Sequence, residues 1–139
     1  MDLVDIYKFM KIFLIISAFF AAFSISANPK VYFINLEDGD RIESPFLIQF
    51  GLSGMGIAPA GTDRENTGHH HLLINVNDID LSKPIPSSSS HIHFGGGQTE
   101  SLVDLMPGEY SMQLILGDMA HTPHNPPIIS QRINITVID

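Results

Sequence analysis

The sequence predicts an all-β fold, because its apolar runs are short, rich in β-branched and aromatic residues, and separated by Gly, Pro, Asn and Asp. Residues 28–139 show no apolar repeat of helical period. About seven such runs recur at intervals of about ten residues, which is typical of an immunoglobulin-like antiparallel β-sandwich. Residues 28–139 are therefore expected to form one domain of about 110 residues, enough to bury a core.

The expected strands follow one another regularly along this domain. Several alternate between core-facing and solvent-facing positions, so that Tyr110, Met112 and Leu114 share one face of their strand. The segment 78–90, which contains a run of serines, is expected to be a polar surface loop. The seven strands are predicted at residues 31–36, 46–52, 70–76, 91–94, 99–105, 109–116 and 129–138.

An N-terminal signal peptide is expected over residues 1–27. Its apolar part, residues 12–23, follows two lysines, and a stretch of small residues ending at Ala27 supplies the cleavage region. The apolar run is shorter than the ~20 residues that span a bilayer, so no stable membrane insertion is expected after cleavage. An uncleaved anchor is the alternative, and translation from Met10 would give a cleaner signal sequence. The protein is expected to be periplasmic or secreted.

Charge and cysteine content exclude several classes of partner and of stabilising bond. The chain carries a formal net charge of −8, so it is not expected to bind nucleic acid or an anionic membrane surface. It has no cysteine, so neither a disulfide nor a thiolate metal site is open to it, and stability must come from the core.

Seven histidines fall in three short clusters, which are the strongest chemical feature of the sequence. If successive strands run up and down, the second-to-third, fourth-to-fifth and sixth-to-seventh connections lie at the same end of the sandwich. Each cluster lies at or beside one of these connections, so all seven imidazoles are expected at one pole. The clusters are His69-His70-His71, His91-Ile92-His93 and His121-Thr122-Pro123-His124.

Strand alternation divides the first cluster between two faces. His70 continues the apolar face of its strand and is expected to be structural, whereas His69 and His71 point together to the other side. Two imidazoles in a His-x-His pair on a strand suit Zn(II) or Cu(II), and His91 and His93 repeat this spacing. We therefore expect the protein to bind a transition metal ion, Cu(II) or Zn(II).

The candidate site consists of imidazoles with polar side chains around them. Met55 and Met119 are thioethers that copper could use, although methionine in a loop is more often hydrophobic fill. The candidate metal ligands are His69, His71, His91, His93, His121 and His124. The residues expected to orient the rings from behind are His70, Gln98, Glu100 and Asp118.

Two other functions fit the same histidines. They could form a structural hydrogen-bond network in a non-metal periplasmic interaction module, each imidazole satisfying backbone groups of the loops. They could also form the active site of a metal-dependent hydrolase, with a metal-bound water as nucleophile. No nucleophile turn such as GxSxG occurs, so no catalytic residue is assigned and enzyme activity is the weaker expectation.

Three blocks of the sequence resemble a known family. They are Gly68–Leu73, His93–Thr99 and Gly117–Pro127, which read GHHHLL, HFGGGQT and GDMAHTPHNPP here. In this order they resemble the bacterial domain-of-unknown-function family 4399, and the likeness extends over nearly all of residues 31–137. The resemblance implies an exported protein and a functional or structural role for the histidines, without specifying an activity.

Overall fold

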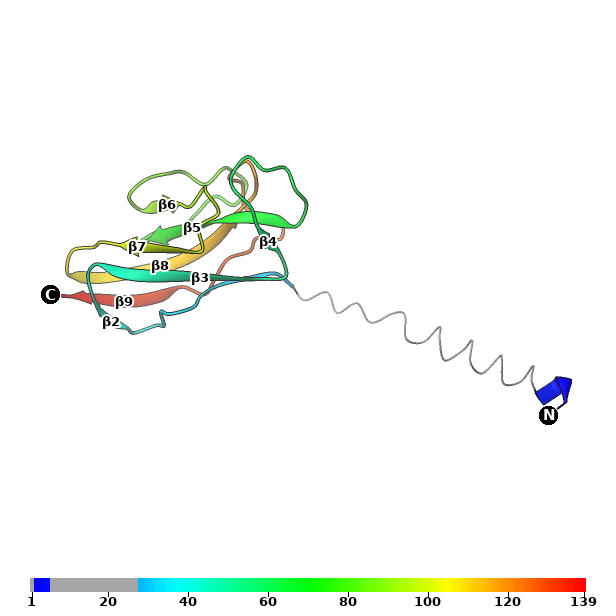
Figure 1. Cartoon of the computed structure of the whole chain (residues 1–139). Helices are drawn as coiled ribbons and strands as arrows, with labels where there is room; N and C mark the ends of the chain where they lie inside the picture. Colours follow the sequence, from blue (N-terminus) through cyan, green and yellow to red (C-terminus); the bar gives the residue numbers. More distant parts are fainter. Residues whose placement is uncertain (1, 6–27) are drawn as a thin grey trace.

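The chain folds into two β-sheets that share one core (Figure 1). The computed structural model describes residues 2–5 and 28–139, so the predicted signal peptide and its apolar part lie almost wholly outside the described residues. Within the two described ranges, no helix combines the length and the apolar character needed to cross a membrane. The all-β prediction is confirmed.

The smaller sheet has three antiparallel strands in the order β1-β3-β7, and the larger sheet follows the order β2-β9-β8-β5-β4, with β6 also paired to β5. The pairs β2–β9 and β4–β5 are parallel, and the other pairs of the larger sheet are antiparallel. The strands are β1 (Lys30–Phe33), β2 (Arg41–Glu43), β3 (Phe46–Ser53), β4 (Gly56–Ile57), β5 (Thr67–Ile74), β6 (His91–His93), β7 (Glu100–Val103), β8 (Gly108–Gly117) and β9 (Ile133–Ile138).

Each of the seven predicted strands is present, with its ends shifted by a few residues. The sequence does not predict β2 and β4, because neither RIE nor GI forms a run of β-branched or aromatic residues. The last predicted strand was placed too early, since β9 begins only at Ile133. Ser130 interrupts regular pairing before it, because its hydroxyl accepts the hydrogen bond of the Leu114 amide at 2.8 Å.

The core lies between the two sheets, and each sheet contributes alternate residues to it. In β3, Phe46, Ile48 and Phe50 are buried, while Leu47 between them is 42% exposed. The same alternation in the larger sheet brings apolar side chains of three neighbouring strands against β3. These side chains are Leu72 and Ile74 of β5, Met112, Leu114 and Leu116 of β8, and Ile133, Ile135 and Val137 of β9.

The segment 78–90 is largely exposed, as its serines predict, but one of its residues anchors it to the sheet. Ile85 in this segment is 5% exposed and packs with Leu73 of β5 and Ile115 of β8, which face away from the main core. The Ile85 amide also donates a hydrogen bond to the carbonyl oxygen of His121 at 2.8 Å. The outer face of the larger sheet is therefore covered here, and β5 is buried on both of its faces.

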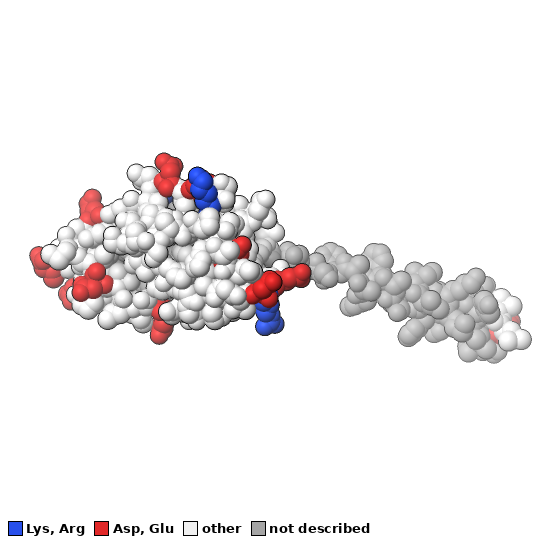
Figure 2. All heavy atoms as spheres, turned by 90° about the horizontal axis from the view of Figure 1, so that it is seen from above, with Lys and Arg blue, Asp and Glu red and all other residues white. Residues whose placement is uncertain are grey.

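The surface of the domain is acidic, in keeping with the net charge of −8. Figure 2 shows the domain from above, with Asp and Glu side chains spread around its periphery and few Lys or Arg side chains among them. Lys and Arg side chains do not gather into a patch on this face.

Truncation of a core side chain should test the assigned core. The Ile48→Ala variant should lose about 2–5 kcal/mol of free energy of unfolding, because Ile48 is fully buried and its truncation leaves a cavity. Leu102→Ala is the matched control: Leu102 is 66% exposed, so this change should cost less than about 0.5 kcal/mol. Urea unfolding measures both, and equal losses would contradict the assignment.

Candidate metal centre

The histidines of β5 lie on opposite faces of that strand, as strand alternation predicts. His69 and His71 are fully buried on the covered outer face of the larger sheet, where their Nε2 atoms lie 3.0 Å apart. His70 is fully buried on the core face, with its ring centroid 5.1 Å from that of Phe50. One strand thus supplies two adjacent imidazoles to the outer face and a third to the core.

His93 joins the two imidazoles of β5 from the neighbouring strand. In the antiparallel pairing of β6 with β5, His93 is the register partner of His71, so both side chains are on the same face. One ring nitrogen from each of His69, His71 and His93 can be chosen so that all three lie within 4.8 Å of one another. This arrangement could hold a metal ion.

His121 closes over the same group from the loop between β8 and β9. Its ring centroid lies 4.6 Å from that of His93, 5.1 Å from that of His69 and 5.9 Å from that of His71. We call these four residues, His69, His71, His93 and His121, the histidine group. Its members come from two strands and one loop that are far apart in sequence, and a shared face of the sheet brings them together.

The backbone around His121 holds its ring in place. His121 has a φ of 66°, in the left-handed region, and its amide donates to the carbonyl of Asp118 at 3.0 Å. The carboxylate oxygen Oδ1 of Asp118 accepts hydrogen bonds from the amides of Ala120 at 2.8 Å and Thr122 at 2.9 Å. Asp118, which the sequence singled out as a residue behind the rings, therefore closes the turn that carries His121.

The two other candidate ligands lie outside the histidine group. The Nδ1 atom of His91 lies 3.0 Å from the hydroxyl oxygen of Ser88, in the turn that precedes β6. His124 lies against the backbone of Gly68, since a Cβ atom built on that glycine would be 2.9 Å from His124 Nε2. Gly68 shares the face of β5 that carries His70, so His124 is on the opposite side from the group.

The remaining polar candidates anchor nearby backbone and have no hydrogen bond to a ring of the histidine group among the described residues. The carbonyl of Gln98 lies 3.3 Å from Nδ1 of His70, and its side-chain oxygen accepts from the Gly96 amide at 2.9 Å. The Glu100 carboxylate accepts from the Gln49 amide group at 3.0 Å on the exposed face of the smaller sheet. Gln98 thus supports the glycine bend after β6, whereas Glu100 pairs with Gln49 on the neighbouring strand β3.

Two glycines make room for the imidazoles, and the sequence did not reveal this role. A Cβ atom on Gly117 of β8 would lie 2.8 Å from Nε2 of His71 and 3.2 Å from its Cδ2. A Cβ atom on Gly95 would overlap the Cε1 and Nε2 side of the His93 ring. Both contacts are closer than real Cβ atoms allow, so each ring occupies space that only glycine leaves open. Glycines placed next to histidine blocks were the only trace of this in the sequence.

Among the described residues, five buried ring nitrogens have no hydrogen-bond partner. A buried polar atom without a partner costs about 1–3 kcal/mol, and such atoms in a native protein commonly mark a bound ion or water. Three of the five belong to the histidine group. The atoms are Nδ1 of His69, Nε2 of His70, Nδ1 of His71, Nε2 of His93 and Nε2 of His124.

Burial keeps these imidazoles neutral at physiological pH. Desolvation, reinforced by the neighbouring rings of the group, lowers the pKa of His69 to about 4 and that of His71 to about 3. Desolvation also lowers the pKa of His93, with a smaller contribution from His121. Neutral imidazole is the form that binds metal ions, so the rings are in the ligating protonation state at neutral pH.

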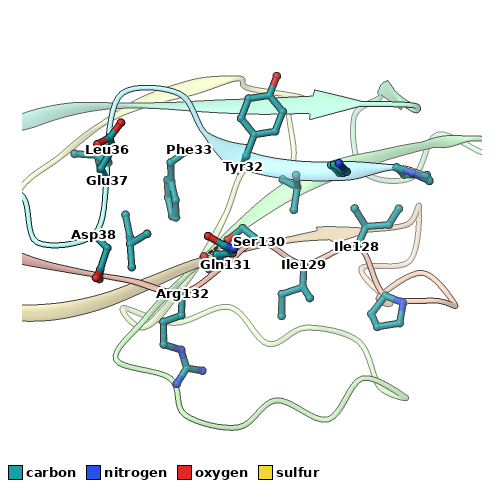
Figure 3. A pocket seen from close by; sticks show the side chains of 15 residues that line it. Tyr32, Phe33, Leu36, Glu37, Asp38, Ile128, Ile129, Ser130, Gln131 and Arg132 are labelled. Carbon is teal, nitrogen blue, oxygen red and sulfur yellow. Dashed lines mark hydrogen bonds between the residues drawn. The ribbon is translucent and has the colours of Figure 1, made fainter. Parts of the chain in front are cut away.

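The domain also has a groove whose lining is separate from the histidine group. It has a volume of about 960 Å³ and is formed by β1, residues 36–38 and residues 127–133 (Figure 3). Tyr32, Ile129 and Arg132 are among its lining side chains, and its lining contains no histidine. The groove and the candidate metal centre are therefore separate features.

The fold and the centre define an all-β domain with a buried histidine group on the outer face of its larger sheet. The chain belongs to the family described as a domain of unknown function, DUF4399, whose family model matches residues 48–138. The resemblance noted from the three sequence blocks is thereby confirmed. The matched range contains every histidine of the group.

Other comparisons add little. No curated protein matches the sequence significantly. Among solved structures, the endo-beta-1,4-mannanase from Thermotoga petrophila is similar with a TM-score of 0.49 and 16% sequence identity over 88% of this chain. The similar region is 22% of the mannanase chain. A likeness this low says nothing about the activity of the present protein.

Without metal, the domain should lose stability as the pH falls below about 6.5, the usual histidine pKa. The lowered pKa values of His69 and His71 mean that only the unfolded chain takes up protons between pH 6.5 and about 4. Protons in that window therefore favour unfolding. In a chelator, we expect the Tm to drop by at least about 5 °C from pH 7.5 to pH 5. The Tm of the His71→Gln variant should drop less over the same pH range. A wild-type Tm that does not change with pH would contradict the burial of neutral rings.

Adding one methyl group to Gly117 should disturb the centre. Gly117→Ala forces its Cβ against the His71 ring, and overpacking of this kind costs about 1–3 kcal/mol. Gly56→Ala is the matched control, because the nearest atom to its Cβ would be a Thr67 methyl at 3.4 Å. Thermal unfolding of the two variants should separate them clearly. Equal stability of both would mean that the His71 ring can move aside freely.

Proposed function

We propose that this protein is an exported, immunoglobulin-like β-sandwich that binds a transition metal ion, Cu(II) or Zn(II), through His69, His71 and His93. One observation carries the proposal: a ring nitrogen from each of these three residues lies within 4.8 Å of the others. Ligand atoms around a tetrahedral zinc ion are about 3.3 Å apart when its bonds are 2.0–2.1 Å. The 3.0 Å between Nε2 of His69 and Nε2 of His71 is already near that spacing.

The unpartnered nitrogens favour a metal site over a purely structural hydrogen-bond network. A network that stabilises the loops would give each buried ring nitrogen a partner. Within the described part of the chain, the His69–His71 contact is the single hydrogen bond between two imidazoles, and three nitrogens of the same group have no partner. One cation would be bound by the facing Nε2 atoms of His69 and His71 together with Nε2 of His93, which has no hydrogen-bond partner.

The donor set restricts the kind of ion. Imidazole nitrogens suit Zn(II), Cu(II) and Ni(II), whereas Ca(II) and Mg(II) require oxygen ligands. The rings are neutral at pH 7, because burial lowers the pKa of His69 and His71. The acidic surface adds a favourable field for a cation approaching the domain.

The export assignment rests on the sequence. Residues 12–23 form an apolar run behind two lysines and ahead of small residues, the pattern of a signal peptide that ends near Ala27. We propose a periplasmic or secreted location for the domain that follows. At such a location a protein without thiols would bind a metal ion of intermediate softness through imidazoles, because oxidation does not destroy imidazoles as it does thiols.

Calorimetric titration of the tag-free domain should test the proposal. At pH 7.5 we expect one Zn(II) or Cu(II) ion to bind per chain with a submicromolar Kd. His69→Ala and His71→Ala should each weaken binding by at least about tenfold, because each removes one ligand of few. Binding should weaken strongly near pH 5, where protons compete for the imidazoles.

His91→Ala is the matched control for these variants. His91 is a histidine of the same strand as His93, but its ring contacts Ser88 and lies outside the group. Its replacement should leave the Kd within about twofold of the wild-type value. Failure of the wild-type domain to bind any of Zn(II), Cu(II) or Ni(II), or equal effects of His71→Ala and His91→Ala, would contradict the proposal.

A further inference from the structure

We infer that the histidine group is a closed, tetrahedral four-imidazole site that favours Zn(II), with His121 as the fourth ligand. The inference rests on the proposed metal binding by His69, His71 and His93 and goes beyond it in two respects. It adds a ligand from a different segment of the chain, and it chooses between the two metals.

The four ring centroids lie at the corners of a nearly regular tetrahedron. The six centroid distances range from 4.6 Å for His93–His121 to 5.9 Å for His71–His121, and the other four are 4.8, 4.9, 5.0 and 5.1 Å. With Zn–N bonds of 2.0–2.1 Å, each imidazole centroid would be about 3.2 Å from the metal, which makes the edges of a tetrahedral site about 5.2 Å long. The observed distances scatter around this value. His121 is not among the three residues whose ring nitrogens already lie within 4.8 Å of one another, so its ring has to turn toward the ion on binding.

A square-planar arrangement does not fit the same distances. If the four ring centroids formed a square at about 3.2 Å from the metal, four of their distances would be about 4.5 Å and the two diagonals about 6.4 Å. The two diagonals would join different pairs of rings, with no ring in common. The longest observed distance joins His71 to His121, and the pair that shares no ring with it, His69–His93, is only 4.9 Å apart. Cu(II) prefers tetragonal coordination, whereas Zn(II) accepts a tetrahedron.

The loop of His121 is built to keep this fourth ring in position. The Asp118 carboxylate binds two amides of the turn, and the His121 carbonyl accepts a hydrogen bond from Ile85 in the covering segment. A ligand fixed in this way costs little conformational entropy when it coordinates an ion. The Ile85 side chain is itself buried against the outer face of the sheet.

A four-imidazole site leaves no coordination position for a water or a substrate. Catalytic zinc sites keep one position open, and structural or carrier sites fill all four. The proposed centre therefore retains a zinc ion and does not activate water, which separates this inference from a metal-dependent hydrolase.

Cobalt(II) spectroscopy and metal competition on the His121→Asn variant should test the inference. Asn tolerates the left-handed backbone of residue 121, so the loop should keep its shape, and circular dichroism checks the fold. Wild-type protein with Co(II) should show the intense visible bands of four-coordinate cobalt. His121→Asn should show weaker and shifted bands, because water replaces the imidazole and further water can raise the coordination number above four.

The same variant should change metal preference. Removal of the fourth ring frees the site to flatten, so the ratio of Cu(II) to Zn(II) affinity should rise by about tenfold or more over wild type. His91→Ala should change neither the spectrum nor the ratio. Identical spectra and ratios for wild type and His121→Asn, with binding still weakened at least about tenfold by His71→Ala, would overturn this inference and leave three-histidine binding intact. If none of the metals binds to the wild type, both proposals fail.

Discussion

The burial of β5 on both faces is the constraint on which the rest of the structure depends. A strand in a two-sheet fold normally has one face in the core and one face in water, so its side chains alternate between apolar and polar. Here the segment 78–90 and the loop of His121 cover the outer face as well. The strand therefore carries apolar residues and histidines in succession, and His69 and His71 are fully buried without lying in the main core.

This arrangement places polar rings where water cannot satisfy them. Imidazoles tolerate burial because they are neutral at physiological pH, and crowding lowers their pKa values further. Their unpartnered nitrogens are costly in the free domain, and coordination of one ion by one nitrogen of each ring would offset part of that cost. Metal binding and stability are then linked, since an ion that binds only the folded chain shifts the folding equilibrium toward it.

Much of the fold and part of the centre follow from the sequence alone. Short β-branched runs predicted seven of the nine strands found in the described residues, and alternation correctly separated His70 from His69 and His71. Other features depend on tertiary packing that no local pattern encodes. Three such features arise from which segments cross the sheet. They are the burial of Ile85, the room left by Gly117, and the position of His124 on the opposite side of β5.

The most direct test of the central claim is anomalous X-ray diffraction from crystals of the zinc-loaded protein, measured on both sides of the zinc absorption edge. We expect one strong anomalous peak bounded by the rings of His69, His71 and His93, with metal–nitrogen distances of about 2.0–2.1 Å. Peaks confined to the acidic periphery, with none within bonding distance of these three rings, would contradict the account.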